Sequence, residues 1–305
     1  AHQTLPSAAG VAALRPRRGL STPIRARNKV AAALPAWQRP GMVYEHILLE
    51  RSPAAVATVT LNRPDSLNAL NAAMVDELRA AVESLAGSEA RCLLLSGAGR
   101  GFSSGADLAG GASAAPGADG FDAGAALEKH FNPLVEALFA LEIPVVAAVN
   151  GPAAGAGASL ALAADIVIAA RSAYFLQAFV NIGLVPDAGA TWLLPRLAGR
   201  ARALEMMMLG ERIPAEQALE WGLIARVVDD EFLDEEAVAL AARLAQGPTV
   251  ALGLIRRLAR ESGRLPLAEA LAAERAAQRR AGETEDFRGA VMAFLQKRQP
   301  RFDGR

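Results

Sequence analysis

Cysteine and histidine are scarce in this sequence of 305 residues, and their scarcity excludes several kinds of site. The one cysteine, Cys92, lies in the apolar run RCLLLSG, so an internal disulfide and a cysteine-based metal cluster are both excluded. The three histidines, His2, His46 and His130, are far apart, and no two have the four-residue spacing of a helical zinc site. We therefore expect no metal, and a reducing compartment, the cytoplasm by default.

Long apolar runs and an excess of one charge are also missing. No run reaches the roughly 20 apolar residues that cross a bilayer. Lys and Arg together number 32, as do Asp and Glu, so the formal net charge is zero. A balanced charge argues against a general role in binding polyanions. We expect neither a membrane nor a nucleic acid among the partners.

Acidic residues are absent from residues 1–43, where every charged residue is basic. The segment is rich in Ala and Pro and has no long apolar core, so it does not resemble a secretory signal. Its composition is typical of an organelle transit peptide, which would change the expected compartment. The alternative is an extension that precedes a true start at Met42. On either interpretation we expect residues 1–41 to be a disordered basic leader.

Strand and helix patterns alternate from Val43 onward. HILLE and AVATVTLNRP alternate apolar and polar residues, and SLNALNAAMVDELRAAVESLAG has helical spacing and closes on Gly87 as a C′ residue. RCLLLSG, PVVAAVNG and DIVIAARS predict strands, whereas EKHFNPLVEALFALEI and PAAGAGASLALAA predict helices. This order predicts an α/β fold with a parallel or mixed sheet. After Leu197 the signals are mostly helical, which predicts a core at 42–198 and a C-terminal helical region at 199–305.

Two glycine-rich corners, SGAGRGFSSGADL and VNGPAAGAGASL, each follow a predicted strand. Glycine lets a backbone approach a ligand closely, and a helix start presents unpaired N–H groups. Two such corners can place two N–H donors on one carbonyl oxygen, which is the geometry of an oxyanion hole. Corners of this kind are also common in α/β folds without any catalytic role. The residues alone leave both interpretations open.

A lone carboxylate stands in NIGLVPDAGATW, where Asp187 follows Pro186 and precedes a flexible Ala-Gly-Ala turn. No histidine, lysine or second acid lies within ten residues of it. The residues alone favour neither a cap of a helix starting near Thr191 nor a catalytic acid. For His130 a structural role is favoured over a general base. Asp65 and Asn68 are expected to form a turn and a helix cap.

Taken together, the motifs resemble those of the crotonase (enoyl-CoA hydratase/isomerase) superfamily over residues 42–305. They occur in the family's order: LNRPDSLNAL, GAGRGFSSGADL, PVVAAVNGPAAGAGASLALAADIVIAA, IGLVPDAGATWLLPRL, GERIPAEQALEWGLIARVV and AFLQKRQPRF. FNPLVEAL, GAGASLAL, FLQAFVNIGLVPDAG and FLQKRQPRFDGR are most similar to the 2-(1,2-epoxy-1,2-dihydrophenyl)acetyl-CoA isomerase subgroup of phenylacetate degradation. The resemblance implies a crotonase (ClpP-like) fold of repeated ββα units with a C-terminal helical trimerisation region. It also implies homo-trimers or hexamers and an acyl-CoA thioester substrate, with coenzyme A as part of the substrate and no separate cofactor.

Matched position by position, the resemblance implies site residues as well. The two backbone N–H groups that bind the thioester carbonyl fall on Ala106 and Ala156. Phe131, Phe179 and Trp192 are expected to line the acyl pocket, together with Phe139 and the loop 110–124. The expected coenzyme A contacts are Asn68, Ala69, Ser104, Asp107 and Leu108, with Lys297 reaching the phosphates bound to a neighbouring subunit.

Two departures from the family's hydratase pattern bear on the reaction. Hydratases carry two glutamates, and the matching positions here are Ser159 and Phe179, neither of which exchanges protons at neutral pH. Each such acid or base typically contributes ~100- to 10,000-fold, so water addition is disfavoured. Asp187 remains, at a position where family isomerases carry an acid. Its apolar neighbours should raise its pKa and strengthen it as a base.

One acid at that place favours an isomerase that moves a double bond, or assists the opening of an epoxide to an oxepin. Three alternatives stay open: a 2-enoyl-CoA hydratase, an enzyme with Asp187 as nucleophile like family dehalogenases, and a non-catalytic acyl-CoA-binding subunit.

Overall fold

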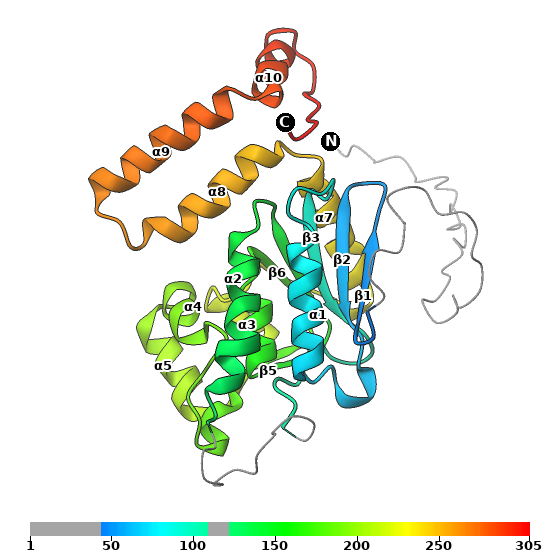
Figure 1. Ribbon diagram of the computed structural model, residues 1–305, viewed down its shortest axis with the longest axis vertical. Helices are drawn as coiled ribbons and strands as arrows, with labels where there is room; N and C mark the ends of the chain where they lie inside the picture. Colours follow the sequence, from blue (N-terminus) through cyan, green and yellow to red (C-terminus); the bar gives the residue numbers. More distant parts are fainter. Residues whose placement is uncertain (1–43, 109–121) are drawn as a thin grey trace, which may run out of the picture. The chain divides into compact units, whose positions relative to one another are not determined.

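The computed structural model describes residues 44–108 and 122–305 (Figure 1). The chain divides into the units Ala1–Arg39 and Pro40–Arg305, and all described residues belong to the second. The leader expected at 1–41 and most of the expected acyl loop at 110–124 lie outside the described residues.

A six-stranded mixed sheet forms the centre of the described fold (Figure 1). The first two strands pair antiparallel, and all the other pairs are parallel. The third and fourth strands are apolar on both faces because helices cover both sides of the sheet. In spatial order the strands are β1 (Ile47–Arg51), β2 (Val56–Leu61), β3 (Cys92–Gly97), β4 (Val145–Val149), β6 (Ile166–Ala170) and β9 (Arg226–Val228).

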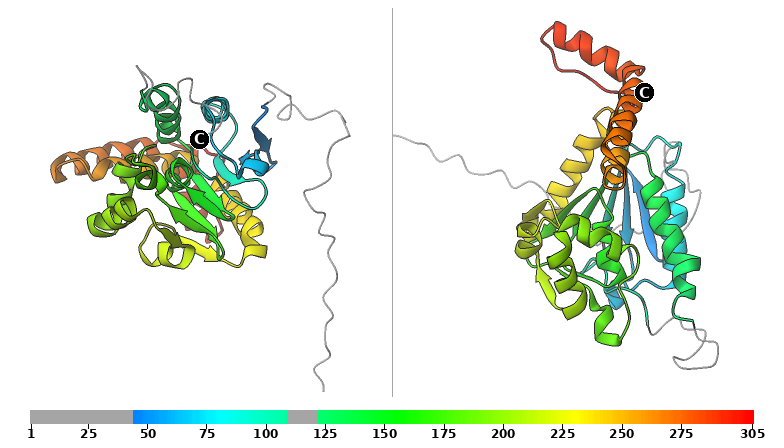
Figure 2. Two further views of the ribbon diagram at one scale, coloured as in Figure 1. Left: turned by 90° about the horizontal axis from the view of Figure 1, so that it is seen from below. Right: turned by 90° about the vertical axis from the view of Figure 1, so that its left-hand side faces the viewer.

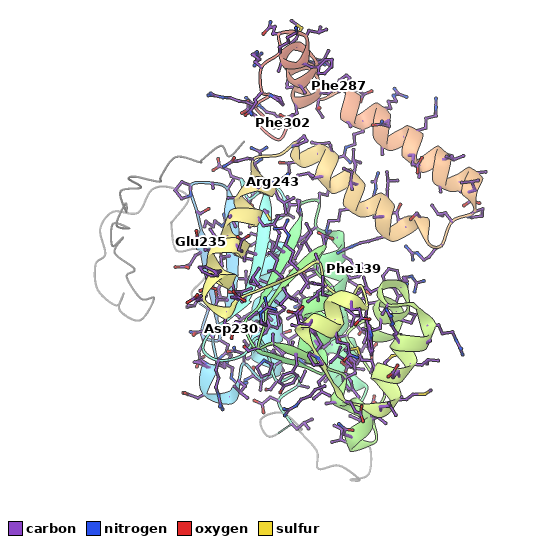
Figure 3. All side chains as sticks on the ribbon, turned by 180° about the vertical axis from the view of Figure 1, so that it is seen from behind. Phe139, Asp230, Glu235, Arg243, Phe287 and Phe302 are labelled. Carbon is purple, nitrogen blue, oxygen red and sulfur yellow. The ribbon has the colours of Figure 1, made fainter. Side chains whose placement is uncertain are left out.

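Helix α7 (Leu233–Ala245) covers one face of this sheet, while α1 (Ala72–Glu83) and α2 (Asn132–Ala140) lie side by side over the other (Figure 2). Figure 3 follows α7 from Glu235 near its start to Arg243 near its end. The fold therefore has a helix–sheet–helix layering, and both apolar faces of the sheet are buried.

The first helix begins and ends at other residues than the sequence predicted. Its N-cap is Asn71, whose Oδ1 accepts a hydrogen bond from the Met74 N–H at 2.8 Å, so the expected cap is wrong. The expected turn is present, because Asp65 lies in the 3-10 turn Pro64–Ser66. The C-cap is Ser84, and Gly87 adopts its positive φ of 68° in the turn beyond the helix. The expectation that Gly87 is the C′ residue is therefore also wrong.

A smaller sheet carries the second glycine corner. It contains β5 (Pro152–Ala154), β7 (Tyr174–Leu176) and β8 (Arg212–Pro214), and the short helix α3 (Ala156–Leu162) follows β5 directly. Strands of three residues are too short to show an alternating pattern, so the sequence did not predict them. The remaining elements before α7 are η2 (Pro64–Ser66), the π-helical turn η3 (Leu127–Phe131), η4 (Ala178–Ile182), α4 (Ala190–Leu197), α5 (Gly199–Leu209), α6 (Ala215–Glu220) and η5 (Asp230–Phe232).

The C-terminal helices are α8 (Thr249–Ser262), α9 (Leu267–Gly282) and α10 (Glu285–Leu295). The chain bends by 106° between Asp230–Ala245 and Thr249–Ser262, where Gly247 and Pro248 interrupt the helix. Region 199–305 is not helical throughout, because β8 lies in it and β9 completes the main sheet. Within the described residues no single helix is long and apolar enough to cross a membrane. The bent pair reaches that length and composition only when its two helices are counted together.

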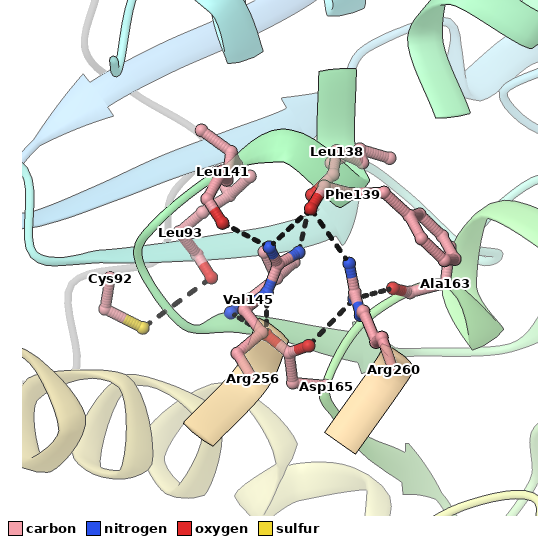
Figure 4. Close-up of polar contacts among 10 residues, drawn as sticks. All are labelled: Cys92, Leu93, Leu138, Phe139, Leu141, Val145, Ala163, Asp165, Arg256 and Arg260. Atoms are coloured by element: carbon pink, nitrogen blue, oxygen red, sulfur yellow. Dashed lines mark hydrogen bonds and ion pairs between the residues drawn. The ribbon is translucent and has the colours of Figure 1, made fainter. Parts of the chain in front are cut away.

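A buried arginine joins α8 to the body (Figure 4). Arg256 is 6% exposed, and its guanidinium donates to the carbonyls of Leu138, Phe139 and Leu141 at the end of α2. Its Nε also lies 2.6 Å from Oδ2 of Asp165, just before β6. These contacts fix α8 against the end of α2 and the start of β6.

Candidate active site

The first glycine corner follows β3 and runs alongside β5. The Ser103 N–H donates to the Pro152 carbonyl at 3.0 Å, and the Ala154 N–H donates to the Ser103 carbonyl at 2.9 Å. On its other side, the Leu70 N–H donates to the Gly105 carbonyl, and the Leu70 carbonyl accepts from the Asp107 N–H. This pairing occupies the residues flanking Ala106, so the N–H of Ala106 points away from Leu70. Ala106 is exposed, and its N–H bonds to no other described residue.

The side chain of Asn68 bonds to the backbone of this corner. Its side chain is fully buried; Nδ2 donates to the carbonyls of Ala98 and Gly101, both at 2.9 Å, and Oδ1 accepts from the Arg63 N–H. Every polar atom of that side chain is thus used within the protein. The arrangement gives Asn68 a structural role in shaping the corner. A direct contact with coenzyme A, as the resemblance implies, stays a prediction.

The second corner is formed by Gly155 and the first residue of α3. Gly155 has φ 51° and ψ −127°, a conformation that residues with a Cβ rarely adopt. The N–H of Ala156 has no partner within the helix, and it donates to no other described group. Ala156 is only 1% exposed. A buried N–H without a partner is costly, so this one is available to a ligand.

The two corners touch each other. A Cβ placed on Gly105 would lie 2.8 Å from the Ala154 oxygen and 3.5 Å from the Cα of Gly155. Only glycine allows so close an approach. The structure therefore brings together the two backbone segments that, by the resemblance, are expected to bind the thioester carbonyl.

Asp187 lies in the turn between η4 and α4, and it does not cap that helix. The N-cap of α4 is Gly189, and no side chain bonds to the helix start. The Asp187 Oδ1 is buried and accepts no hydrogen bond from the described residues. Burial raises the pKa of the Asp187 carboxyl to about 6. The helix-cap interpretation is wrong, and the predicted rise in pKa is confirmed.

Backbone strain surrounds this acid. Ala188 has a φ of 49° and Gly189 a φ of 84°, so two consecutive residues are left-handed. A non-glycine residue held in this region costs of order 1–3 kcal/mol, and such residues cluster at functional sites. The turn therefore holds Asp187 in a defined position rather than leaving it on a free loop.

Phe179 connects the turn that carries Asp187 to the second corner. Its carbonyl accepts a hydrogen bond from the Leu184 N–H at 2.9 Å, which closes the segment that leads to Asp187. Its ring is 3.7 Å from the place where a Cβ on Gly155 would lie. Ser159 reaches the same glycine, because its hydroxyl donates to the Gly155 carbonyl at 3.2 Å. Both positions that match the hydratase glutamates therefore contact Gly155, and neither carries an ionisable group.

The remaining residues predicted to contact coenzyme A differ widely in their exposure to solvent. Ala69 is 8% exposed, Ser104 is exposed, and Leu108 is 69% exposed. Asp107 forms an ion pair with Arg63, whose NH1 lies 2.9 Å from Oδ2. Lys297 is exposed and has a φ of 54° just beyond α10. Ser104, Asp107 and Leu108 lie on the first corner, whereas Lys297 follows α10, the last of the C-terminal helices.

The structure separates the predicted acyl-pocket residues. Phe131 is 7% exposed and packs in the core, and Phe179 reaches the second corner. Trp192 instead contacts Phe139, with ring centroids 5.6 Å apart, and both line a cavity of about 610 Å³ between α4 and α8. Neither Phe131 nor Phe179 lines that cavity. The expectation that Trp192 shares one pocket with them gains no support from this arrangement.

Three polar residues near the corners were not predicted from the sequence. Arg63 pairs with Asp107, and Asn150 donates from Nδ2 to the carbonyls of Gly97 at 3.0 Å and Gly99 at 2.9 Å. Gln177 is fully buried, and neither polar atom of its side chain has a partner among the described residues. An amide directly after the run VVAAV was a usable signal for Asn150, since polar residues at strand ends often tie neighbouring loops.

His130 has the structural role favoured for it. Its Nδ1 lies 2.9 Å from Oδ1 of Asp76, which joins η3 to α1. Among residues 44–108 and 122–305, no group of three or more His, Cys, Asp or Glu side chains is placed to hold a metal ion.

Comparison with known proteins matches residues 51–305 to the family described as Enoyl-CoA hydratase/isomerase. The chain is 49% identical over 259 residues to the 1,2-epoxyphenylacetyl-CoA isomerase of Escherichia coli (strain K12), covering 85% of this chain and 98% of that protein. It is 48% identical over 264 residues to a Rhodobacter capsulatus protein named "Probable enoyl-CoA hydratase", covering 87% of this chain and all of that one.

A solved structure of enoyl-CoA hydratase from Bacillus anthracis superposes with a TM-score of 0.78 at 31% identity, covering 86% of this chain and 100% of that one. The paired glycine corners and the mixed sheet thus occur in a chain that matches this family over most of its length. The chain belongs to the enoyl-CoA hydratase/isomerase family and has the crotonase fold.

Proposed function

We propose that this protein is an acyl-CoA isomerase that uses a backbone oxyanion hole and one acid, Asp187. Its substrate is an unsaturated acyl-CoA in which a double bond moves, with 1,2-epoxyphenylacetyl-CoA, opened to oxepin-CoA, as the preferred case. The observation that carries the proposal is the environment of Asp187: a buried Oδ1 without a partner and a pKa raised to about 6.

Ala106 and Ala156 would hold the thioester carbonyl. Their N–H groups are unpaired within the described residues, and their corners touch through Gly105 and Gly155. Two donors on the carbonyl oxygen stabilise the negative charge that develops there when a conjugated C–H bond loses its proton. The reaction needs no side chain from either alanine, which agrees with their identity.

Asp187 would then act alone as the proton carrier. Its carboxylate takes a proton from one carbon, the electron pair moves toward the thioester oxygen, and the same carboxyl returns the proton to another carbon. A pKa of about 6 suits both steps, because the acid and base forms are both accessible near neutral pH. In the epoxide substrate, the acid form assists opening of the three-membered ring.

Water addition is disfavoured by the residues at the two hydratase positions. Ser159 donates its hydroxyl to a backbone carbonyl, and Phe179 places a ring against Gly155. Neither can activate a water molecule. The E. coli relative at 49% identity is named an isomerase of epoxyphenylacetyl-CoA, which supports that substrate, whereas the R. capsulatus relative bears a hydratase name.

We extend the proposal to assembly as homo-trimers or hexamers through the C-terminal helices. Helices α9 and α10 expose large apolar side chains that a folded monomer rarely leaves in water. The exposed fractions are 75% for Leu267, 53% for Leu271, 81% for Phe294 and 69% for Leu295. Lys297, directly after α10, would then reach the coenzyme A phosphates on a neighbouring subunit.

The test is a substrate panel of epoxyphenylacetyl-CoA, a 3-enoyl-CoA and a 2-enoyl-CoA, assayed with the wild type and with Asp187→Asn. We expect isomerisation of the first two and very slow hydration of the third. Asp187→Asn keeps the shape of the side chain but loses its proton transfer, so kcat should fall by about 100- to 10,000-fold. Products are identified by mass spectrometry and by ultraviolet absorption.

The matched control is Asp65→Asn, which makes the same change on an exposed residue and should leave kcat unchanged. Rapid hydration of the 2-enoyl-CoA that survives Asp187→Asn would favour a hydratase. A trapped covalent adduct on Asp187 would favour a nucleophile, and a wild type inactive on all three thioesters would favour a non-catalytic binding subunit.

A further inference from the structure

The peptide unit that joins Gly155 to Ala156 is held by several contacts on every side except one. The Gly155 N–H donates to the Leu176 carbonyl at 2.7 Å. The Gly155 carbonyl accepts two hydrogen bonds from Ser159, one from the backbone N–H at 3.1 Å and one from the hydroxyl at 3.2 Å. The ring of Phe179 lies 3.7 Å from the place where a Cβ of Gly155 would be. Only the N–H of Ala156 is left without a partner among the described residues.

The carbonyl of Gly155 and the N–H of Ala156 belong to the same planar unit. In a trans peptide these two groups point in opposite directions, and rotating one rotates the other. A contact that fixes the carbonyl oxygen therefore fixes the direction in which the Ala156 N–H points. The Ser159 hydroxyl makes such a contact.

A glycine at this corner needs that restraint. Gly155 has φ 51° and ψ −127°, and glycine has many other conformations of similar energy. Conformations of this kind persist where the surrounding structure over-determines them. Without the hydroxyl, the Gly155 carbonyl would keep only the hydrogen bond from the Ser159 N–H, and the Ala156 N–H would sample a wider range of directions.

A purely structural reason for this hydroxyl is weak. All seven residues of α3 are buried, and the other six, in AGASLAL, are Ala, Gly or Leu. Burying a hydroxyl costs free energy that its hydrogen bond only offsets. A serine that bonds to the carbonyl four residues earlier also slightly destabilises a helix. Alanine would suit this position better if packing were its only requirement.

We infer that Ser159 is a positioning residue of the carbonyl-binding site: its hydroxyl holds the Gly155 carbonyl so that the Ala156 N–H points at the thioester oxygen. The inference rests on the proposed function of the two glycine corners. Hydrogen bonding to the carbonyl also polarises the peptide, which strengthens its N–H as a donor. Ser159 thus replaces a proton-transferring residue of the hydratases with one that acts through the backbone.

The test compares Ser159→Ala and Ser159→Thr with the wild type. Alanine removes one oxygen and favours the helix, so the fold should be retained, and threonine keeps the hydroxyl. Each protein is saturated with a para-dimethylaminocinnamoyl-CoA, whose absorption shifts to the red when its carbonyl is polarised. We expect a smaller red shift for Ser159→Ala, a kcat about 3- to 10-fold lower, and a KM within about twofold of wild type. Ser159→Thr should recover both the shift and kcat.

The control is Ser84→Ala, because the Ser84 hydroxyl also donates to a backbone carbonyl, that of Ala81 at 2.7 Å, at the end of α1. It should change neither the red shift nor kcat. A red shift and kcat for Ser159→Ala equal to those of the wild type would overturn the inference while leaving the proposed function intact. A wild type that produces no red shift and no isomer would instead overturn the proposed function. The position of the shifted band does not depend on the amount of folded protein, so partial loss of folded Ser159→Ala cannot by itself reduce the shift.

Discussion

The protein surrounds the carboxylates of Asp165, whose side chain is 21% exposed, and of the partly buried Asp187 in opposite ways. Asp165 accepts hydrogen bonds at both oxygens: the Val145 N–H and the Arg256 Nε bind Oδ2 at 2.8 and 2.6 Å, and Arg260 binds Oδ1 at 2.8 Å (Figure 4). Asp187 has a buried Oδ1 that no described residue reaches, and burial raises the pKa of its carboxyl to about 6.

The difference separates an acid that holds the fold together from one that, under the proposed function, carries the proton. Charge at Asp165 is compensated by two arginines, so it ties α8 to the starts of β4 and β6. Charge at Asp187 is compensated by nothing in the described structure, so its ionised form costs free energy whenever no ligand is bound. Carboxyls with a strongly raised pKa cluster at functional sites in folded proteins.

Removing Arg256 should have the largest effect on stability. Arg256→Met keeps the apolar stem but leaves the Asp165 carboxylate with less compensation and removes the donors to three carbonyls at the end of α2. Breaking a buried charge pair from one side typically costs about 3–5 kcal/mol. We expect the free energy of unfolding to fall by about that amount in a urea titration. Turnover per folded molecule should be unchanged, since Arg256 contacts neither glycine corner.

The control for this change is Arg257→Met on the neighbouring, exposed residue of α8. It should alter the free energy of unfolding by no more than about 0.5 kcal/mol. Equal losses for the two variants would mean that the contacts of Arg256 contribute nothing beyond an ordinary surface arginine.

The same Asp→Asn substitution should change stability in opposite directions at the two acids. Asp165→Asn removes charge that two arginines bind, and we expect it to lower the free energy of unfolding by about 2 kcal/mol. Asp187→Asn removes an unpaired charge, so near pH 7 it should raise that free energy by about 1–2 kcal/mol, after allowance for the partial exposure of the side chain. Urea unfolding of the two variants and the wild type measures both changes.

The gain from Asp187→Asn should depend on pH. The folded protein holds the pKa of this carboxyl at about 6, above its ordinary 3.8. The folded state therefore binds the proton more tightly than the unfolded state, and ionisation costs stability in full only above about pH 6. Below about pH 4 the carboxyl is neutral in both states and the cost vanishes. A stabilisation by Asp187→Asn that is as large at pH 4 as at pH 7.5 would contradict this account.

The sequence was more informative about Asp187 than about Asp165. The residues alone left Asp187 open between a helix cap and a catalytic acid, and the resemblance to the family favoured the acid. Nothing near it in the chain could pair with it, and its Oδ1 has no partner among the described residues either. The role of Asp165 could not be predicted in this way, because its partners Arg256 and Arg260 lie 91 and 95 residues away. The spacing of those arginines by four residues places them on one face of a helix, but nothing local shows what that face contacts.

The glycine corners illustrate the same limit. Their glycines and their positions after strands left open whether the two backbone segments meet. The resemblance to the family implied that they do, and the structure places Gly105 against Ala154 and Gly155. The side chains that brace them, Asn68 and Asn150, act across tens of residues, and Asn68 was instead expected to cap a helix. Short strands such as β7 were missed because three residues show no periodicity.

Replacing Arg260 should have the smallest effect on the free energy of unfolding. Its guanidinium lies 4.0 Å from the centre of the Phe139 ring, donates to the Ala163 carbonyl at 3.0 Å and binds Asp165. Partial burial lowers the pKa of Arg260 to about 10, yet it remains charged at neutral pH.

Arg260→Lys keeps that charge but loses the planar stacking and the fork of donors, which should cost about 1 kcal/mol in urea unfolding. Arg264→Lys, at an exposed position two residues beyond α8, should cost nothing measurable. If Arg260→Lys were equally silent, charge alone would compensate Asp165, and the contrast with Asp187 would rest on the presence of cations rather than on the geometry of their hydrogen bonds.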